Sequence, residues 1–447
     1  MGRPQPYEDE TMHDSASTAP TGSEPRPPGA QPQGAGREPD GASPCNTAPS
    51  NCIPPENVTV LRQGIDSLYL SYPGRASLEV ETKLIALKDL AQAENPLKQA
   101  QASLQLGSHL FRVHGKGAGY YPYILSDNAY YLKISRPWAK QIPLVYVQIA
   151  SHWLTAKGVE YVAQELDTLV ALLGTVEDEA QVSRADIYVD FVSQMPLNSL
   201  SVGQFVSRAR RISTHTMGRR FTGYSIGLGG DISARLYDKT EEIKESGKTY
   251  LYDLWRETGW NGADIVYRLE FQFERKTLTE HEAKTVPALL AKMGPLWRYA
   301  TLHWLKLTIP SLTDTTQSRW PLHPVWADLA NVVWLDSQPG TSQPVRPDRA
   351  PSDYYLFANG LSGLTSYMAR EGLTDPDTAA DAYFDAARRF HNTQAHYTGI
   401  DFKGYVREKA ALKARDYNLT YPDIQEARDE HLTEAMAKAY RKAKDGE

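Results

Sequence analysis

The stretch R-A-D-I-Y-V-D-F, from Arg184 to Phe191, alternates apolar and polar side chains with a period of two. This period predicts a β-strand, because successive side chains of a strand point to opposite faces. Asp186, Tyr188 and Asp190 then share one face, and the apolar residues share the other. Two carboxylates on one strand face repel each other unless a cation or a proton lies between them. Taken alone, the stretch fits the solvated outer face of an antiparallel sheet better than a metal site.

Two further stretches of the chain alternate in the same way. The polar face of I-S-A-R-L-Y-D-K, from Ile232 to Lys239, carries Ser233, Arg235, Tyr237 and Lys239. The polar face of V-Y-R-L-E-F-Q-F-E-R, from Val266 to Arg275, carries Arg268, Glu270, Gln272 and Glu274. If the three stretches pair in one sheet, these polar faces combine.

The combined face would hold oxygen ligands of the kind that Mg²⁺ and Mn²⁺ prefer, next to cations that suit an anionic substrate such as a phosphate. Its carboxylates are Asp186, Asp190 and Glu270. Its cations are Arg235, Lys239 and Arg268. Purely structural roles are the alternative. A strand tyrosine such as Tyr237 usually packs its ring and leaves its hydroxyl in water, and Arg268 and Glu270 could simply form ion pairs with residues of neighbouring strands.

The composition limits the kind of protein this can be. The chain has 447 residues, of which 41% are hydrophobic, and a formal net charge of −6. This charge excludes a protein that coats nucleic acid with a basic surface, so any nucleic-acid site must come from a local group of basic residues. No apolar run approaches the roughly 18 residues that span a membrane, the N-terminus does not read as a signal peptide, and Cys45 and Cys52 are not part of a zinc motif. We expect a cytoplasmic protein without a membrane partner.

A local basic segment does occur. Between Phe191 and Gly230 the chain contains no Asp or Glu, although the protein as a whole is acidic. The arginines of this segment are Arg208, Arg210, Arg211, Arg219 and Arg220. Their excess predicts a patch for a polyanion, and we favour contact with DNA over the alternative, a solvated helix face.

The chain divides by composition into four parts. These are a disordered Pro/Gly-rich tail (1–57), a main domain (58–337), a linker (338–352) and a helical C-terminal region (353–447). The main domain mixes strands and helices without a regular βαβ repeat, so we expect an α+β fold around a mainly antiparallel sheet. Helices are expected at residues 156–174 and 200–212, among others. The C-terminal helices could add DNA contacts, form a dimer surface or be merely charged and solvated.

The pieces occur in the order R-A-D-I-Y-V-D-F, then T-G-Y-S-I-G with a glycine turn and I-S-A-R-L-Y-D-K-T-E-E, then W-N-G-A-D-I-V-Y-R-L-E-F-Q-F-E-R. In this order the chain resembles the replication initiation factor family, the rolling-circle initiators and related relaxases of plasmids, integrative elements and filamentous phages. The resemblance covers residues 58–334 and is strongest over residues 184–275. It implies a central antiparallel sheet related to the HUH nuclease fold, and a catalytic domain that nicks one strand of duplex DNA at an origin.

The resemblance also implies roles for particular residues. Tyr237, by its motif, would attack the scissile phosphate, form a covalent 5′-phosphotyrosine link and leave a 3′-OH primer. Arg235 and Lys239, two residues to either side, would favour its phenolate. Carboxylates would have to hold the assisting Mg²⁺ or Mn²⁺, because the chain lacks a His-hydrophobe-His motif. These metal ligands would be Asp186, Asp190 and Glu270.

The implied partners are origin DNA at a single-stranded or cruciform nick site, a host helicase and a second copy of the chain, in the bacterial cytoplasm. Arg268 and the five arginines of the basic segment would contact the DNA. Two alternatives stay open. One is a metal-dependent nuclease that activates water, in which Tyr237 is structural. The other is an origin-binding protein without catalysis, which would bind DNA in a salt-sensitive way but not cleave it.

Overall fold

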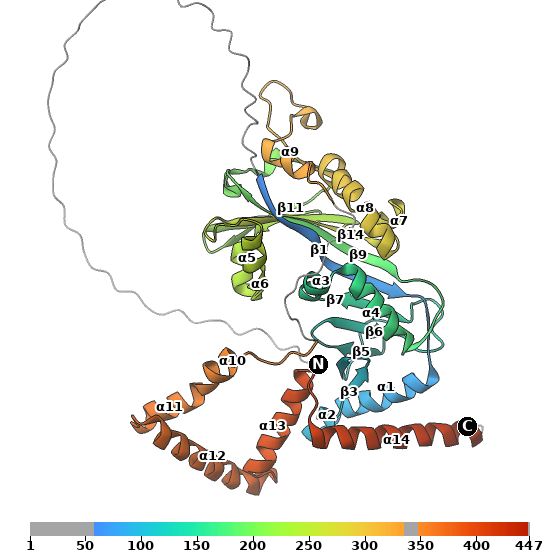
Figure 1. Ribbon diagram of the computed structural model, residues 1–447, viewed down its shortest axis with the longest axis vertical. Helices are drawn as coiled ribbons and strands as arrows, with labels where there is room; N and C mark the ends of the chain where they lie inside the picture. Colours follow the sequence, from blue (N-terminus) through green and yellow to red (C-terminus); the bar gives the residue numbers. More distant parts are fainter. Residues whose placement is uncertain (1–57, 335–346, 446–447) are drawn as a thin grey trace, which may run out of the picture. The chain divides into compact units, whose positions relative to one another are not determined.

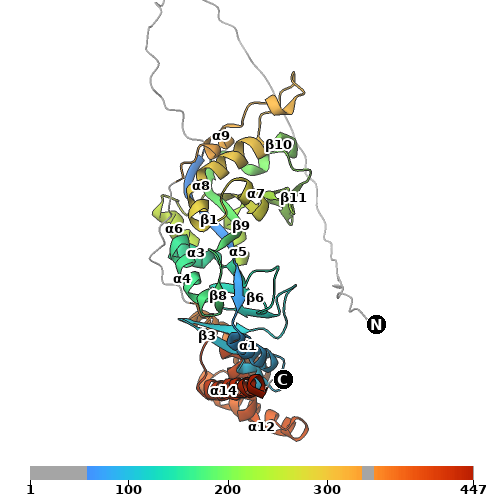
Figure 2. The ribbon, with the colours of Figure 1, turned by 90° about the vertical axis from the view of Figure 1, so that its right-hand side faces the viewer.

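Eleven antiparallel strands form one large sheet, with helices on both of its faces (Figures 1 and 2). A computed structural model describes residues 58–334 and 347–445, which all belong to one compact unit, residues 55–447. The strand order is β11-β12-β13-β14-β9-β1-β7-β6-β5-β4-β3. The expected α+β class, with a mainly antiparallel sheet and a helical C-terminal region, is confirmed.

The strands of this sheet are β1 (Val58–Tyr72), β3 (Ser103–Leu106), β4 (His109–Val113), β5 (Tyr123–Ser126), β6 (Tyr130–Ile134), β7 (Val145–Ile149), β9 (Gln181–Ser193), β11 (Ile212–Met217), β12 (Arg220–Ile226), β13 (Ile232–Asp238) and β14 (Val266–Glu274). Two small sheets pair β2 (Gly74–Ala76) with β8 (Gly174–Val176) and β10 (Phe205–Ser207) with β15 (Leu305–Leu307). The helices are α1 (Leu78–Ala91), α2 (Pro96–Ala100), α3 (Ser151–Lys157), α4 (Val159–Ala171), α5 (Lys239–Ser246), α6 (Tyr250–Glu257), α7 (Arg275–Glu280), α8 (Val286–Tyr299), α9 (Pro324–Ala330), α10 (Asp353–Phe357), α11 (Ser362–Glu371), α12 (Pro376–Thr398), α13 (Phe402–Asp416) and α14 (Pro422–Asp445).

The three alternating stretches become neighbouring strands, in the order β13, β14 and β9. Glu270 of β14 lies opposite Arg235 of β13 on one side and opposite Tyr188 of β9 on the other. Directly opposed residues of paired strands share a face. The predicted union of three polar faces in one sheet is therefore confirmed.

The other face of these strands is buried. Ile187 and Val189 of β9 have no exposed surface, and Phe271 of β14 meets Trp297 of α8 edge-on, with ring centroids 5.3 Å apart. α7 and α8 lie on this apolar side of the sheet, and α5 and α6 lie on the polar side (Figure 1). Because α5 and α6 cover part of the polar face, they decide which of its residues can meet a ligand.

Two expected helices differ from the structure. Residues 200–212 contain a 3₁₀ turn and β10, because Phe205 packs against Tyr224 with ring centroids 4.9 Å apart and β10 pairs with β15. Residues 156–174 are divided at Gly158, whose φ of 82° separates α3 from α4. Glycine adopts this left-handed conformation without the steric cost that other residues meet.

The last part of the C-terminal region, from the end of α13 through α14, is bonded to the sheet at β3, β4 and β5. Asn418, just after α13, donates through Nδ2 to the carbonyl oxygens of Leu110 and Ser126, at 3.0 and 2.9 Å. Arg428 of α14 donates to the Ser103 hydroxyl at 3.0 Å. The expected tail and residues 335–346 of the chain lie outside the described residues. No helix in the described part is both long enough and apolar enough to cross a membrane.

Candidate functional site

Tyr237 lines a cleft at the polar face of the sheet. Its half-buried ring borders a cavity of about 460 Å³ together with His215 and Arg235. Gly223 of β12 lies directly opposite Tyr237, and a Cβ at Gly223 would lie only 2.6 Å from the Cβ of Tyr237. Because Gly223 has no Cβ, the side chain of Tyr237 can lie directly against the backbone of β12.

The hydroxyl of Tyr237 faces a carboxylate on the neighbouring strand. Tyr237 Oη donates to Glu270 Oε2 at 3.4 Å, and Arg235 Nη1 lies 3.7 Å from Glu270 Oε1. Burial, together with the charges of Asp66 and Asp186, raises the pKa of Glu270 to about 7. A carboxylate with such a pKa can take up a proton near neutral pH, as a general base must.

The effect of neighbouring cations on the tyrosine is outweighed, because the charge of Arg268 lowers the pKa of Tyr237 less than its surroundings raise it. Burial and the charge of Glu270 raise the pKa of Tyr237 well above its ordinary value. Lys239, the first residue of α5, is buried and pairs with Glu242 of the same helix, and burial lowers the pKa of Lys239. Deprotonation of Tyr237 therefore requires a base, and Glu270 is in position to act as one.

A buried ion-pair network next to Tyr237 contains Arg268 and Asp190. Arg268 Nε and Nη2 donate to the two oxygens of Asp190 at 2.6 and 2.9 Å, and Nη1 donates to Asp66 at 2.5 Å. Trp255 of α6 donates to Asp190 Oδ2 at 3.0 Å. Arg268 is 1% exposed and Asp190 is 0% exposed. The prediction that Arg268 contacts DNA is therefore wrong, and Asp190 is the counter-charge of Arg268.

Tyr188, the other tyrosine on the polar face of these strands, is enclosed by the same network. The Arg268 guanidinium lies 3.8 Å from the centroid of its ring, and Arg62 Nε donates to its hydroxyl at 3.0 Å. Tyr188 is 3% exposed. Between these two tyrosines, Tyr237 is the one that a substrate could reach.

Asp186, the remaining predicted metal ligand, pairs with Arg184 on the same strand. Arg184 Nε and Nη2 donate to its two oxygens at 2.7 and 2.5 Å, yet burial outweighs this pairing and raises the pKa of Asp186. Throughout the described residues, no three or more His, Cys, Asp or Glu side chains are arranged to hold a metal ion. The geometry therefore does not bring Asp186, Asp190 and Glu270 together as a metal site.

The five predicted DNA-binding arginines lie in two groups, one before and one after β11, which is an edge strand of the sheet. Arg208, Arg210 and Arg211 line a cavity of about 420 Å³ before β11, and Arg219 and Arg220 lie at the turn after it. The six residues of β11 place about 20 Å between the groups. Arg220 is also paired with two carboxylates. Contact of these arginines with DNA stays a prediction.

Sequence reasoning missed three residues that shape the site, Asp66, Gly223 and Trp255. Asp66 falls where the register of β1 against β9 shifts between Ile65 and Ser67, and such a bulge cannot be read from alternation. The position of Gly223 could have been found by folding the hairpin about its glycine turn, which sets Gly223 against Tyr237. Trp255 carried no signal, since it reaches Asp190 only through the tertiary placement of α6.

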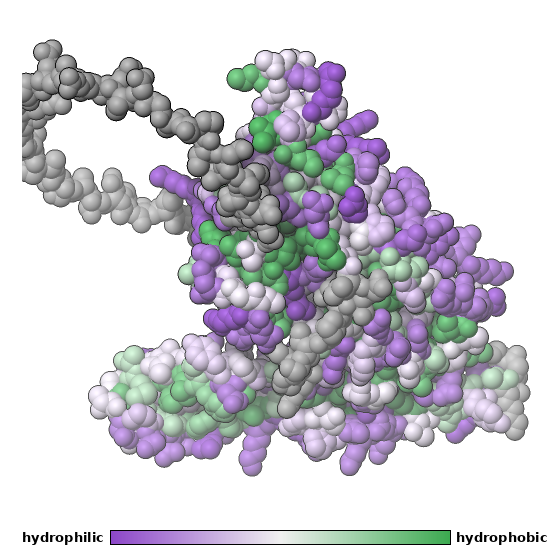
Figure 3. Space-filling view, turned by 45° about the horizontal axis from the view of Figure 1, so that its top comes forward, coloured by the Kyte–Doolittle hydropathy of each residue, from purple (hydrophilic) through white to green (hydrophobic). Residues whose placement is uncertain are grey.

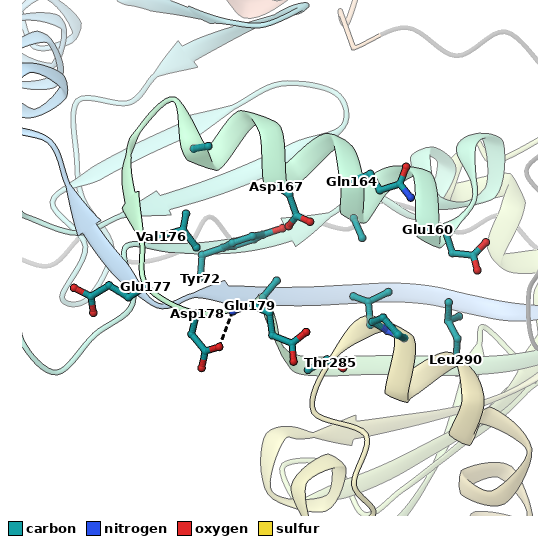
Figure 4. Close-up of a pocket in the computed structure, with 15 residues that line it drawn as sticks. Tyr72, Glu160, Gln164, Asp167, Val176, Glu177, Asp178, Glu179, Thr285 and Leu290 are labelled. Carbon is teal, nitrogen blue, oxygen red and sulfur yellow. Dashed lines mark hydrogen bonds between the residues drawn. The ribbon is translucent and has the colours of Figure 1, made fainter.

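A separate cavity of about 610 Å³ is bordered by α4 and the start of α8 (Figure 4). Its polar lining is acidic and consists largely of Glu160, Asp167, Glu177, Asp178 and Glu179. These carboxylates would repel a phosphate, so this cavity does not fit DNA.

Comparisons with known proteins add little to this geometry. No protein-family model and no curated protein matches the chain. Among solved structures, a rolling circle replication initiator protein from Geobacillus stearothermophilus is similar over 60% of this chain and 95% of that chain, with 14% sequence identity and a TM-score of 0.36. A similarity at this level carries no argument, so the function must be argued from the site.

Proposed function

We propose that the chain is a rolling-circle replication initiator that nicks one strand of origin DNA with Tyr237 as the nucleophile. The observation that carries the proposal is the contact of the Tyr237 hydroxyl with Glu270, a carboxylate whose pKa is about 7. Tyr237 lines a cleft that is open to a substrate, and Glu270, which is 4% exposed, is buried next to it. The resemblance of the three strands to the replication initiation factor family supports the same reaction.

In the proposed reaction, the Tyr237 oxygen attacks the phosphorus atom while its proton passes to Glu270 Oε2. The bond from phosphorus to the 3′ oxygen breaks, and this oxygen takes up a proton from water and becomes the 3′-OH primer. The 5′ phosphate stays on Tyr237 as a phosphodiester. Arg235, whose side chain is 47% exposed next to Glu270, would stabilise charge on a non-bridging phosphate oxygen. Because the covalent link preserves a phosphodiester, the strand can be rejoined without ATP.

Dependence on Mg²⁺ or Mn²⁺ stays a proposal without a defined site. Of the three predicted ligands, Glu270 alone contacts Tyr237, whereas Asp190 and Asp186 are paired with arginines. A divalent ion would supply neutralisation of phosphate charge. The transfer to Tyr237 described above is argued without it, and comparison of Mn²⁺ with excess EDTA tests the dependence directly.

The decisive experiment is incubation of the full chain with Mn²⁺ and single-stranded DNA from the origin of the replicon that encodes it. We expect a protein–DNA adduct that survives a denaturing gel and maps to Tyr237. Tyr237→Phe should abolish the adduct, because the nucleophilic oxygen is removed. Tyr161→Phe, at a half-exposed tyrosine on α4, is the matched control and should preserve it.

The alternatives give different results in this experiment. A nuclease that activates water would cleave the DNA without forming an adduct, and Tyr237→Phe would still cleave. Binding without cleavage would indicate an origin-binding protein. A host helicase and a second copy of the chain remain proposed partners.

A further inference from the structure

The polar face of the sheet continues beyond the Tyr237 cleft as a group of tyrosines. Arg184 lies on the polar face of β9, and Tyr69 of β1 lies directly opposite it. The register of β1 with β7 and of β7 with β6 brings Tyr146 and Tyr131 to the same face. All three rings are half-buried, so each presents part of its surface to solvent. We refer to Tyr69, Tyr131 and Tyr146 as the tyrosine platform.

Cations lie against these rings. The Arg184 guanidinium is 4.9 Å from the centroid of the Tyr69 ring. Lys133 Nζ is 5.2 Å from the Tyr146 ring and 5.9 Å from the Tyr131 ring. Among the residues that the structure describes, Lys133 forms no ion pair with a carboxylate, so its charge is available to a ligand.

A cavity of about 760 Å³ opens next to the platform and includes Tyr146 in its lining. Tyr121 lies in the same lining, with its ring centroid 6.5 Å from that of Tyr146. The cations around the cavity are Arg75, Lys140 and Arg275. Two carboxylates also line it: Glu177 pairs with Arg75 at 3.1 Å, and Glu274 accepts a hydrogen bond from Gln272 at 2.7 Å and keeps its charge, so three cations face two carboxylates. The cavity thus offers aromatic surface and excess positive charge.

We infer that the tyrosine platform and its cavity bind single-stranded DNA next to the nick site, with bases stacked on the tyrosines and phosphates on Lys133 and Lys140. Stacking on half-exposed aromatic rings with interleaved cations is how proteins bind single strands without reading their sequence. A duplex hides its base faces and would gain only the charge contacts. The inference rests on the proposed function, because it supplies the strand that Tyr237 is to cut.

The platform lies within reach of Tyr237 on the same sheet. Three strand spacings separate β13 from β1, which is about 14 Å. Along β9, six residues separate Asp190, in the row of Tyr237, from Arg184, in the row of Tyr69, which is about 20 Å. A bound strand would therefore extend several nucleotides from the scissile phosphate to the platform.

The test measures binding of fluorescent (dT)15 and of a duplex of the same length by anisotropy. The full chain with Tyr237→Phe is used, so that no adduct contributes to the signal. We expect tighter binding of (dT)15 than of the duplex, and at least tenfold weaker (dT)15 binding for Tyr131→Ala with Tyr146→Ala. Replacing the alanine at Tyr146 by phenylalanine (Tyr146→Phe) retains an aromatic face and should bring back the affinity for (dT)15 that Tyr146→Ala loses. Tyr161→Ala, on α4, should leave affinity unchanged.

The platform is excluded if the double alanine variant, folded by circular dichroism, binds (dT)15 as tightly as its parent. Equal affinity for (dT)15 and for the duplex would also overturn the inference. So would the absence of any (dT)15 binding, which would leave the platform as a surface for a protein partner. Failure of the proposed function gives a different result from failure of the platform. In that case the wild-type chain binds (dT)15 normally but forms no adduct at Tyr237.

Discussion

The contact between Tyr237 and Glu270 makes the proposed nicking step depend on pH. Glu270 must be ionised to accept the proton, and its pKa is about 7. The single-turnover rate of adduct formation should therefore rise from pH 6 to pH 8 and level off above that. Glu270→Gln removes the base and should slow the reaction by about a hundredfold or more. A variant that keeps the wild-type rate and pH profile would exclude Glu270 as the base.

A second prediction concerns the room that Gly223 gives Tyr237. In Gly223→Ala, the new methyl group would meet the Cβ of Tyr237 at 2.6 Å and the Leu236 carbonyl oxygen at 2.7 Å. We expect loss of about 1–3 kcal/mol in the free energy of unfolding and a lower adduct yield, as Tyr237 shifts. Urea denaturation and the adduct gel measure these two effects. Gly203→Ala, where the new atom would meet only a side chain at 3.9 Å, should change neither.

Single residues also mark the limit of what the sequence could predict. Alternation placed Asp190 of β9 and Arg268 of β14 correctly on one face of the sheet, together with Tyr237 of β13. Alternation could not predict that Asp190 and Arg268 are buried. Their burial depends on Trp255 of α6, which lies 65 residues further along the chain from Asp190. Pairing with a distant element turned a predicted metal ligand and a predicted DNA contact into one buried ion pair.

At the scale of elements, a buried histidine joins β4 to the turn before β6 and to α4. His109 Nδ1 lies 2.6 Å from Asp127 Oδ2, and its Nε2 lies 3.4 Å from Glu165 Oε1. Burial opposes the charged imidazolium, but the hydrogen bonds and charges of the two carboxylates outweigh it and raise the pKa of His109 to about 9. The imidazolium is therefore more stable in the folded protein than in the unfolded chain.

This shift predicts a stability that depends on pH. The contribution of His109 is fully present below its unfolded pKa, near 6.5, and is lost as pH rises through about 9. We expect the free energy of unfolding to fall by about 3 kcal/mol from this group between pH 6 and pH 10. Urea denaturation across this range measures it. In His109→Gln the fall should be smaller, and an equal fall in both proteins would contradict the assignment.

Elements with a clear period were predictable, and elements set by packing were not. β14 matches its alternating pattern nearly residue for residue, since one face is apolar throughout. The residues around Phe205 were expected to be helical, but they pair with β15 and pack on Tyr224, contacts made by residues distant in sequence. β11 is exposed along its whole length apart from Ile212, so it has no apolar face from which a period could be recognised.

Over the whole molecule, the C-terminal helices present apolar surface that the fold does not use. Phe357 is 67% exposed and Phe390 is 60% exposed, and Figure 3 shows hydrophobic residues mixed with hydrophilic ones where Figure 1 has α10 to α12. Exposed apolar groups mark an interaction surface where they form a contiguous patch, whereas singly scattered ones are ordinary. A dimer through these helices stays a prediction, which analytical ultracentrifugation of the full chain can measure.

The net charge of −6 means that DNA binding must come from local cations rather than from the field of the whole protein. Each phosphate neutralised by a lysine releases counterions, so the logarithm of the (dT)15 affinity falls linearly with the logarithm of salt concentration, by about 0.7 per contact with a single strand. Lys133→Gln should reduce this slope by about 0.7. Lys83→Gln, on α1 and already paired with Glu79, should leave it unchanged. A slope unaltered by Lys133→Gln would mean that the strand does not cross the sheet at β6, because Lys133 is the platform cation that no carboxylate in the described chain neutralises.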